Sequence, residues 1–526
     1  MYRKDFHTTT TARIMDSSTT NFVIIGAGPV GILTALAVAK ATKDPSRVVV
    51  YEYRPNLEQR LEESYPIGVS PRGLRALQAV CRLAHDQIRD TGVLVDSWDI
   101  YAGARQVAEV KSGTTMGHTR FSITDTLYQQ AIAEGIQVKM GYKLSGLDVA
   151  SKTLTFTLEE GTKEETVDCR TSVVIAADGS SSATRRLLES AAESTDDASY
   201  APTRNDTTPW QMYFRVLVMD GNGVTAESSS VPLKPNSHSI YSGVYIALIG
   251  PPGQRQWVVV PSGKLNTPDA EWFFLESDNP STEMMDKLRK YLAEKIPPIQ
   301  DTEKYFTDSE IQAFFSRRLF TGSLISLAPL NYPHNQMDDK SNNTPSKEKS
   351  WIVFLGDSAH GVFPATGEGL NSGLDDVYVL CQTVLWPAYG DPRATLPKTD
   401  IIDLAAYAEE RQPDVDALSI LAKDILTMTT GTPKMKAISL MTTILAAMAR
   451  SLRFIGPSEA ELRYGPNSDK ELLPYREVLR RHLRDTFVPR TIATGIVSLY
   501  YVLSAPFGLI ASLIRANNKA LSPKAE

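Results

Sequence analysis

A chain of 526 residues exceeds what one ordinary hydrophobic core organises, so its length predicts two or more domains. Its formal net charge of −6 at pH 7 excludes the broad basic surface of a nucleic-acid-binding protein, and we expect no DNA or RNA partner. The three cysteines, Cys81, Cys169 and Cys381, are far apart, so we expect no disulfide framework, no metal site and a reducing compartment.

The N-terminal segment, residues 1–20, lacks the apolar core of a secretory signal, so we expect a disordered extension. A transit peptide is the alternative, because basic residues stand among hydroxyl residues there. Two acidic residues, Asp5 and Asp16, interrupt that pattern.

The segment NFVIIGAGPVGILTALAVAK predicts a buried strand, a G-x-G-x-x-G turn and a helix. Gly26 allows a tight turn, Gly28 lets the backbone approach a pyrophosphate, and Gly31 lets the helix lie close to the strand. The next strand, RVVVYEY, reaches Glu52, 21 residues after Gly31, where a carboxylate can accept hydrogen bonds from an adenosine ribose. This unit predicts a dinucleotide site but leaves NAD and FAD open.

Two further strand-to-helix turns follow. TSVVIAADGSSSATRRLL predicts a strand that ends at Asp178 and Gly179. WIVFLGDSAHGVFPATGEGLNSGLDDVYVL predicts a strand, then Gly356 and Asp357, then a glycine-rich loop that leads into a new helix. Backbone N–H groups at a helix start suit an anionic ligand, and a reduced flavin carries negative charge, so this third motif favours FAD. Taken singly, each motif also suits an ordinary turn.

In this order the three motifs resemble those of the FAD-dependent monooxygenases of the p-hydroxybenzoate hydroxylase type. The segments IGVSPRGLRAL, ADGSSSATRRLL, GDSAHGVFPATGEGLNSGLDD and RQPDVDALS are most similar to the kynurenine 3-monooxygenase branch. The resemblance implies an α/β fold, with a Rossmann-like FAD-binding domain, an inserted β-sheet substrate domain and a helical C-terminal region ending in an apolar membrane segment. It also implies FAD as cofactor, NADPH or NADH as co-substrate, and O2.

The resemblance implies roles for single residues. Glu52 would hold the adenosine ribose, Arg72 would lie near the flavin, and Asp357 would bind the ribityl chain. Asp178 and Gly179 would contact the cofactor. The loop residues expected to border the isoalloxazine ring are Pro364, Gly367, Gly369, Leu370 and Asn371. His360 is expected to be structural, and no catalytic residue is assigned.

Three departures from that branch concern its ligands. Where the branch presents an arginine to the substrate carboxylate, the stretch VDSWDIY offers Trp98. The cofactor arginine of the branch is replaced by Asp125, and Arg120 is the nearby residue able to compensate. A helical tyrosine that helps to bind kynurenine falls within SILAKDILTM, which contains none. We therefore expect a substrate other than kynurenine.

The middle of the chain contains aromatic, β-rich stretches, WQMYFRVLVM, SIYSGVYIALIG and RQWVVVPSG. They predict a sheet that covers the flavin, with the substrate between sheet and ring. The candidate substrate residues are Trp98, Tyr213, Tyr245 and Trp257. For the last three, filling the core of the sheet is the alternative.

These segments set the expected domain boundaries. The FAD-binding domain would be discontinuous, over residues 21–192 and 350–400. The substrate domain would span residues 193–330, followed by a polar surface loop at 331–349, and a helical region would span residues 401–490.

The C-terminal residues 491–514 carry no charge, and 24 helical residues at ~1.5 Å each would cross the ~30 Å hydrocarbon layer. We expect a membrane-associated, intracellular protein, with the mitochondrial outer membrane or the endoplasmic reticulum as candidate sites. Two helices that break at Pro506 and pack on the protein are the alternative.

The resulting functional hypothesis is hydroxylation of an aromatic or other electron-rich small molecule. Epoxidation of an alkene in a lipophilic natural product, reduction of a prenyl chain and an inactive membrane-tethered flavoprotein are the alternatives. The sequence does not predict the oligomeric state.

Overall fold

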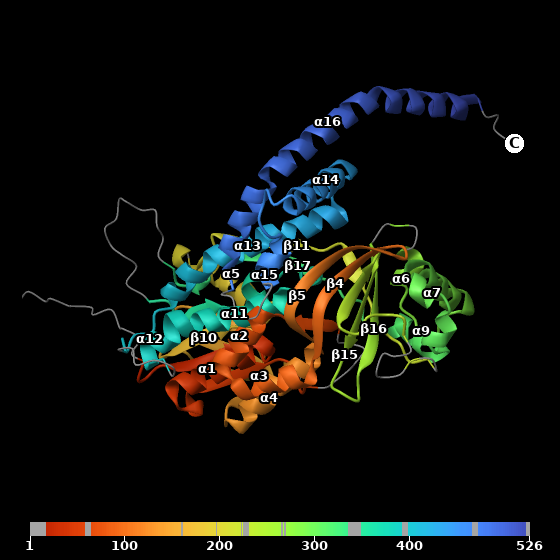
Figure 1. The fold of residues 1–526 in the computed structure, drawn as a ribbon. Coiled ribbons are helices and arrows are strands. Elements are labelled where there is room, and N and C mark those ends of the chain that lie inside the picture. The colour runs from red at the N-terminus through yellow and green to blue at the C-terminus, as the bar shows by residue number, and fades with distance from the viewer. Residues whose placement is uncertain are drawn as a thin grey trace, which may run out of the picture.

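The computed structural model describes residues 17–57, 65–158, 161–195, 197–221, 224, 231–264, 267, 270–334, 349–391, 398–464 and 472–521, with backbone alone at 270–271, 429–430 and 504–521. Figure 1 shows a helix-covered sheet, a second sheet beside it, and C-terminal helices that rise from the region between them.

The first sheet has six strands in the order β18-β19-β10-β1-β2-β6, and all neighbours pair in parallel except the antiparallel edge strand β18. Its central strands are continuous apolar runs, as expected where helices cover both faces. The strands are β1 (Asn21–Ile25), β2 (Val48–Glu52), β6 (Gln137–Met140), β10 (Ser172–Ala176), β18 (Asn331–Tyr332) and β19 (Ile352–Phe354).

Helices around the first sheet complete the largest hydrophobic core. They are α1 (Pro29–Thr42), α2 (Pro71–Val80), α3 (Arg82–Thr91), α4 (Arg120–Ala133), α5 (Ala183–Thr195), α10 (Asp357–His360), α11 (Gly369–Leu380) and α12 (Trp386–Tyr389). Two small antiparallel sheets flank them, one of β7 (Lys143–Asp148), β8 (Thr153–Leu158) and β9 (Lys163–Asp168), the other of β11 (Arg204–Pro209) and β17 (Ser323–Ala328).

The second sheet runs β12-β16-β15-β14-β4-β5-β3, with β13 also paired to β16. Its strands are β3 (Pro66–Val69), β4 (Val93–Ala102), β5 (Arg105–Thr119), β12 (Met212–Phe214), β13 (Leu217–Val218), β14 (Ser237–Tyr241), β15 (Val244–Ile249) and β16 (Gln256–Lys264). The three β-rich stretches singled out in the sequence supply β12 to β16. Strands β3 to β5, in contrast, lie within residues 21–192, which the sequence assigned to the FAD-binding domain. They belong to the second sheet because β4 pairs with β14.

Both faces of strands β14 to β16 are largely buried, and their side chains alternate between two cores. One core contains Val244, Ile246 and Leu248 and is covered by helices on the side away from the first sheet (Figure 1). These helices are α6 (Ala270–Phe274), α7 (Thr282–Lys295), α8 (Thr302–Tyr305) and α9 (Asp308–Ser316). The other core contains Ala247 and Ile249 and faces the FAD-binding domain and the C-terminal helices. We call this second side the flavin-facing side of the sheet, after the FAD-binding domain that the sequence predicts.

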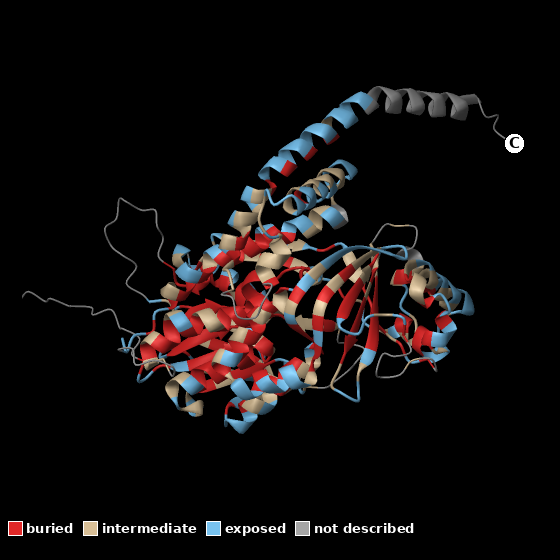
Figure 2. Cartoon of the chain, viewed as in Figure 1, coloured by how far each residue is buried: buried red, intermediate tan, exposed pale blue. Residues whose placement is uncertain are grey.

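The C-terminal region consists of α13 (Leu404–Thr430), α14 (Pro433–Ser451), α15 (Glu459–Tyr464) and α16 (Tyr475–Leu521). Helix α16 is one helix that continues past Pro506, so the structure does not contain the break considered above. Its stretch Tyr475–Leu503 is long and apolar enough to cross a membrane by length and composition. Figure 2 shows α14 and the coloured part of α16 as mostly exposed or intermediate, in contrast to the mainly buried sheets.

The structure describes part of each of two segments that the sequence predicts to be loops. In the expected N-terminal extension, residues 1–16 lie outside the described residues, but Ser17 and Thr20 are buried, and their carbonyls accept hydrogen bonds from Arg47. In the expected polar loop, residues 335–348 lie outside the described part, whereas Asn331 and Tyr332 form β18 because they pair with β19.

Candidate functional site

The three sequence motifs meet at one edge of the first sheet. Strands β1, β10 and β19 are parallel neighbours, so their carboxyl ends bring the glycine turn, Asp178 and Asp357 to the same edge. Strand β2 pairs on the other side of β1 and ends there at Glu52. In open α/β sheets this edge is where ligands bind.

The three glycines of the first motif have different surroundings. A Cβ on Gly26, whose φ is +102°, would lie 2.5 Å from the carbonyl oxygen of Ala177, and a Cβ on Gly31 would overlap the carbonyl oxygen of Gly26. Gly28 has no atom within 4 Å of its Cβ position. Gly26 and Gly31 therefore permit close packing, while the open backbone at Gly28 is accessible to a ligand at the start of α1.

Glu52 is buried, and the protein fixes its carboxylate from two sides. Its Oε2 accepts a 2.7 Å hydrogen bond from the Ala27 amide, and Oε1 accepts from the Arg54 amide at 3.0 Å and from Arg54 Nε at 2.7 Å. A carboxylate offers about four acceptor positions, so about one remains for a ribose hydroxyl.

Asp178 has one satisfied and one unsatisfied oxygen. Oδ2 accepts from the amide and the hydroxyl of Thr184, both at 2.9 Å, whereas the buried Oδ1 has no partner among the described residues. Gly179, with φ of +75°, has open space at its Cβ position. A buried acceptor without a donor is costly, so this oxygen suits a ligand donor.

Arg185 joins the second motif to the third. Its guanidinium donates to the carbonyl oxygens of Ser358 at 2.5 Å and Ser180 at 2.9 Å. The two strand ends are thereby held in a fixed relation, although they are far apart in the sequence.

Protein surrounds Asp357, although its side chain keeps surface exposure. Its side chain is exposed by surface area, yet burial raises the pKa of its carboxyl, and Arg120 and His360 oppose part of that shift. The carboxyl is therefore accessible to solvent on one side and surrounded by protein on the others. Oδ1 lies 3.6 Å from the Cβ position of Gly369, the first residue of α11.

Tyr65 lies near the same region, although none of the sequence motifs includes it. Burial raises the pKa of its phenol, with Arg120 opposing and Asp357 adding to the shift. Arg120, an exposed residue at the start of α4, is thus electrostatically close to both Tyr65 and Asp357. The structure brings Arg120 to the region where the sequence expected a compensating cation.

Residues 364–371, which we call the ring loop, carry five of the predicted cofactor residues. Pro364 opens a 3-10 turn, Gly367 has φ of +67°, and α11 begins at Gly369. The first N–H groups of α11 have no partner within the helix and carry partial positive charge. Leu370, half-buried in that first turn, packs against the main core.

Asn371 fixes the ring loop to the segment before α2. Its Oδ1 accepts from the Ser70 amide at 2.8 Å, and its Nδ2 donates to the carbonyl oxygens of Gly68 at 2.9 Å and Gly367 at 2.8 Å. Asn371 therefore uses three of its about four hydrogen-bonding positions in holding the loop in place.

Arg72 lies behind the ring loop, in a buried charge network. It donates to Asp375 Oδ2 at 3.1 Å and to the Leu473 carbonyl at 2.6 Å, and its guanidinium lies 4.1 Å from the Tyr475 ring centroid. Burial would raise the pKa of Asp375, but Arg72, Arg411 and Arg75 overcome it and lower that pKa to about 2.

Asp376 continues the same network toward the third motif. Its Oδ1 accepts from Arg411 Nε at 2.6 Å, and its Oδ2 accepts from the Gly356 amide at 2.6 Å and lies 2.6 Å from His360 Nε2. His360 is buried in this contact, in agreement with the structural role expected for it.

Trp98 lies beside the ring loop, on strand β4. Its ring atoms are 3.6 Å and 3.7 Å from the Cβ position of Gly367, and it packs edge-on against Tyr464 at 4.7 Å between ring centroids. Tyr245, on β15, packs against the core of the flavin-facing side of the sheet. These two candidate substrate residues therefore lie toward the first sheet.

Tyr213 and Trp257 do not lie there. Trp257 is fully buried in the core on the opposite side of the second sheet, and Tyr213 packs edge-on against Phe274 of α6. Strand alternation is the reason, because their neighbours Phe214 and Val258 occupy the flavin-facing side instead.

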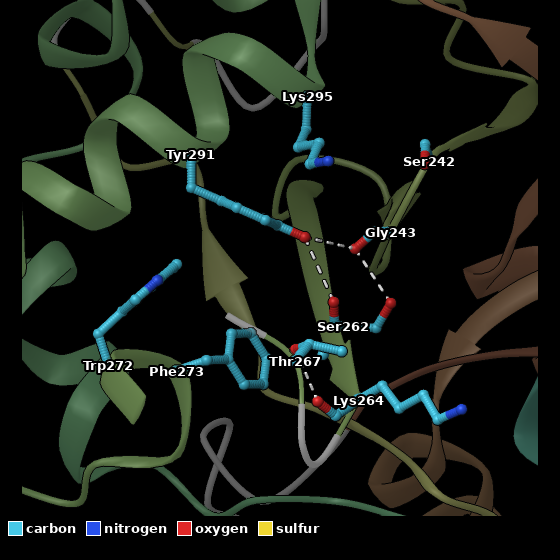
Figure 3. Close-up of a pocket in the computed structure, with 10 residues that line it drawn as sticks. Ser242, Gly243, Ser262, Lys264, Thr267, Trp272, Phe273, Tyr291 and Lys295 are labelled. Carbon is cyan, nitrogen blue, oxygen red and sulfur yellow. Dashed lines mark hydrogen bonds between the residues drawn. The ribbon is translucent and has the colours of Figure 1, made fainter. Parts of the chain in front are cut away.

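A separate pocket of about 180 Å³ lies between the β14–β15 turn, the end of β16, α6 and α7 (Figure 3). There the Tyr291 hydroxyl donates to the carbonyl oxygens of Gly243 at 3.2 Å and Ser262 at 3.3 Å. None of the residues predicted from the sequence lines this pocket.

Comparison with known proteins identifies the family. The family model described as FAD binding domain matches residues 19–220 and 295–418, more than half of the chain. The chain belongs to this family, and it is an FAD-dependent monooxygenase.

Two relatives are kynurenine 3-monooxygenases. That of Candida albicans is 25% identical over 414 residues, covering 76% of this chain and 78% of the relative. That of Salinispora tropica is 25% identical over 519 residues, covering 94% of this chain and 98% of the relative. The family resemblance inferred from the motifs is confirmed.

Solved structures share the fold. The tetrameric form of 2-methyl-3-hydroxypyridine-5-carboxylic acid oxygenase matches with a TM-score of 0.55 at 14% identity, covering 81% of this chain and 95% of that one. CtdE in complex with FAD matches with a TM-score of 0.51 at 13% identity, covering 90% and 100%.

The site fits the cofactor that the family implies. The backbone is open at Gly28, a buried oxygen of Asp178 lacks a donor among the described groups, and the carboxyl of Asp357 is accessible although protein surrounds it. FAD is the cofactor of this chain, and NADPH or NADH is the usual co-substrate in this family.

Proposed function

We propose that this enzyme hydroxylates an aromatic or other electron-rich small molecule that is not kynurenine, with NADPH or NADH as reductant. The observation that carries the exclusion of kynurenine is the position of Trp98, whose indole lies against Gly367 of the ring loop. A substrate carboxylate placed there would lose its hydration without gaining a cation from this side chain, which is unfavourable.

The same proposal assigns the cofactor contacts. The pyrophosphate would lie at Gly26, Gly28 and Gly31, with the adenosine ribose at Glu52. Asp178, Gly179 and Asp357 would bind the remainder of the chain toward the ring. The ring loop, at Pro364, Gly367, Gly369, Leu370 and Asn371, would border the isoalloxazine, with Arg120 nearby and Arg72 supporting the loop from behind.

Bound FAD supplies the redox chemistry and the activation of O2. The chain contributes the surroundings of that chemistry. The first turn of α11, which belongs to the ring loop, would present partially positive N–H groups to the isoalloxazine, and this favours negative charge on a reduced flavin. The buried side chains between the second sheet and the ring loop exclude water from the reacting atoms.

The C-terminal helix supports membrane attachment. Large apolar residues of α16 are exposed in the described part, among them Phe487 at 69%, Leu499 at 60% and Val502 at 68%. Helix α14 packs beside α16 and adds exposed Ile444 and Met448. We infer an intracellular protein held on a membrane by this surface, with the mitochondrial outer membrane and the endoplasmic reticulum as candidate locations.

Epoxidation of an alkene in a lipophilic molecule is the second candidate. It is favoured by the apolar core on the flavin-facing side, where Phe214, Phe320 and Phe363 pack together with residues of α13 and α16. Both reactions add one oxygen atom to the substrate.

The test is oxygen consumption by the detergent-purified, FAD-loaded protein with NADPH or NADH and panels of aromatic and terpenoid compounds. Substrate-stimulated oxygen uptake and a product heavier by one oxygen atom support the proposal. A product that differs by two hydrogens, formed without oxygen uptake, indicates a reductase of prenyl chains. Failure to bind FAD indicates an inactive membrane-tethered protein.

A further inference from the structure

A tyrosine and a histidine form a polar pair on the flavin-facing side of the second sheet. His238 of β14 is paired with Trp98 of β4 in the parallel register, so the two side chains project to the same side. Tyr245 of β15 is opposite Ile240 of β14, two positions along from His238, and it packs against the core on that side. The pair therefore shares the side of the sheet that places Trp98 next to the ring loop.

The pair is tightly bonded and uncharged at neutral pH. The Tyr245 hydroxyl lies 2.6 Å from His238 Nδ1, and the two rings meet edge-on with centroids 5.2 Å apart. Burial lowers the pKa of His238 to about 3 and raises the pKa of Tyr245 well above its usual value. The hydrogen bond therefore joins a neutral phenol to a neutral imidazole.

Tyr245 is partly exposed, whereas its partner His238 is buried. Tyr245 retains partial surface exposure although protein surrounds its ring closely enough to shift its pKa, the same combination found at Asp357. His238 is almost completely buried. A phenol hydroxyl both donates and accepts, and the contact with Nδ1 uses only one of these capacities.

The protein does not satisfy the pair completely. His238 Nε2 is buried and has no hydrogen-bond partner among the residues that the structure describes. The other side chains on this side of the sheet include Trp98, Phe214, Ala247, Val258 and Val260, which are apolar apart from the indole N–H. The Tyr245–His238 pair thus lies among these apolar side chains, where an unpaired polar group is costly.

We propose that Tyr245 contacts the substrate and that its hydroxyl hydrogen-bonds an uncharged hydroxyl or carbonyl group on a largely apolar molecule, with His238 as the positioning residue that aims it. This inference deepens the proposed function and rests on it. Tyr245 sets specificity through its free hydrogen-bonding capacity, and His238 acts only through Tyr245.

The experiment titrates the FAD-loaded full-length protein, without NADPH, and follows the visible absorption of the flavin. The probes are 2-naphthol, its methyl ether 2-methoxynaphthalene, and 2-naphthoate. We expect 2-naphthol to bind about tenfold more tightly than the methyl ether, since only 2-naphthol provides a hydroxyl that can both donate and accept. We expect 2-naphthoate to bind most weakly.

Variants then distinguish a direct contact between Tyr245 and the ligand from a purely structural role of this residue. Tyr245→Phe should reduce the preference for 2-naphthol to about twofold or less. Tyr241→Phe is the matched control, because Tyr241 belongs to the same hairpin but packs in the core on the opposite side, and it should leave the preference unchanged. His238→Ala should also reduce the preference, while His238→Asn, which keeps an acceptor near the position of Nδ1, should restore most of it.

An unchanged preference in Tyr245→Phe overturns the inference, as does the absence of any spectral response to 2-naphthol in the unsubstituted protein. Equal losses in His238→Ala and His238→Asn overturn the positioning role of His238. The titration requires no turnover, so a failure of the proposed function, seen as absent oxygen uptake, is distinguishable from a failure of this inference.

Discussion

Tyr475 donates its hydroxyl hydrogen to Glu368 Oε2 at 2.6 Å, so the first residue of the C-terminal helix α16 is bonded to the ring loop. Both side chains are buried. Tyr464 of α15 adds a second link, since its hydroxyl donates to the Thr366 carbonyl at 3.2 Å. The C-terminal helices therefore form part of the wall of the candidate flavin site.

This link predicts the effect of Tyr475→Phe. The substitution leaves a buried carboxylate oxygen without its donor, which costs about 1–3 kcal/mol. We expect the melting temperature to fall by several degrees and the affinity for FAD to weaken, measured by thermal unfolding and by flavin fluorescence titration. Tyr500→Phe, at an exposed position farther along the same helix, is the control and should change neither quantity. Equal behaviour of the two variants would contradict the prediction.

The buried Asp375 predicts a loss of stability in acid. The three arginines hold its folded-state pKa at about 2, below the ordinary value of 3.8. A depressed pKa stabilises the fold at pH values above the ordinary pKa, and this contribution is lost as the pH falls from about 4 toward about 2. The contribution is about 2 kcal/mol in free energy of unfolding, because each pKa unit corresponds to about 1.4 kcal/mol.

Denaturant unfolding between pH 6 and pH 3 measures this effect, within the range where the protein stays soluble. Arg75→Gln is the informative variant, because Arg75 is the partly exposed member of the network and its loss leaves Arg72 and Arg411 in place. The variant should be less stable at neutral pH and should lose less stability on acidification. If the free energy of unfolding of Arg75→Gln and of the unsubstituted protein fell equally with pH, Asp375 would not be the source of the acid instability.

The glycine turn allows folding and cofactor binding to be separated. Gly31→Ala places a methyl group on the carbonyl oxygen of Gly26, and backbone cannot move aside easily, so we expect a loss of stability of several kcal/mol. Gly28→Ala has open space in the protein, so its stability without FAD should stay within about 0.5 kcal/mol of the unsubstituted chain. Its affinity for FAD should fall at least about tenfold, because the methyl group occupies the path of the pyrophosphate. Normal FAD binding by Gly28→Ala would show that the dinucleotide lies elsewhere.

Local motifs were predictable from the sequence because their chemistry depends on neighbouring residues. The glycine turn, Glu52 and the strand-to-helix turns at Asp178 and Asp357 are each contained in one short segment, and the structure brings them to one edge of the sheet. The side toward which an aromatic strand residue points was not predictable in the same way. Both sides of strands β15 and β16 are largely buried, so apolar residues fill them without a polar alternation to distinguish the sides.

Contacts between residues far apart in the sequence were the second feature of the site that could not be predicted. Arg72 finds its carboxylate at Asp375, 303 positions later, and its carbonyl partner at Leu473, 401 positions later. Nothing near Arg72 in the sequence signals a network that supports the ring loop from behind. Tyr65 and His238 were missed for the same reason, because their significance comes from packing against distant strands and loops.

Trp98 predicts how the preference for charged ligands can be changed. Trp98→Arg introduces a guanidinium beside Gly367, where a carboxylate would gain a charged partner. We expect the affinity for 2-naphthoate, followed by the flavin spectrum, to rise about tenfold, since hydrogen bonds to charged groups contribute about 1.5–3 kcal/mol. Trp98→Phe controls for the lost contact with Tyr464 and should not improve binding of the acid. Equal affinities of the two variants for 2-naphthoate would show that residue 98 does not contact the bound ligand.

The exposed apolar surface of α16 predicts binding to lipid vesicles. Replacing both Leu499 and Val502 by Asp puts two charges on a helix surface that would otherwise enter the hydrocarbon region, and each charge costs about 2.5–3.5 kcal/mol at the centre of a bilayer. We expect the full-length protein to float with vesicles of phosphatidylcholine and phosphatidylserine, and the double variant to remain mostly in the soluble fraction. FAD content should stay the same, because neither residue contacts the ring loop or the glycine turn in the structure. Replacing the same two residues by Ile and Leu, respectively, keeps the surface apolar and should preserve flotation. Equal flotation of the aspartate variant and the apolar control would mean that α16 does not hold the protein on the membrane.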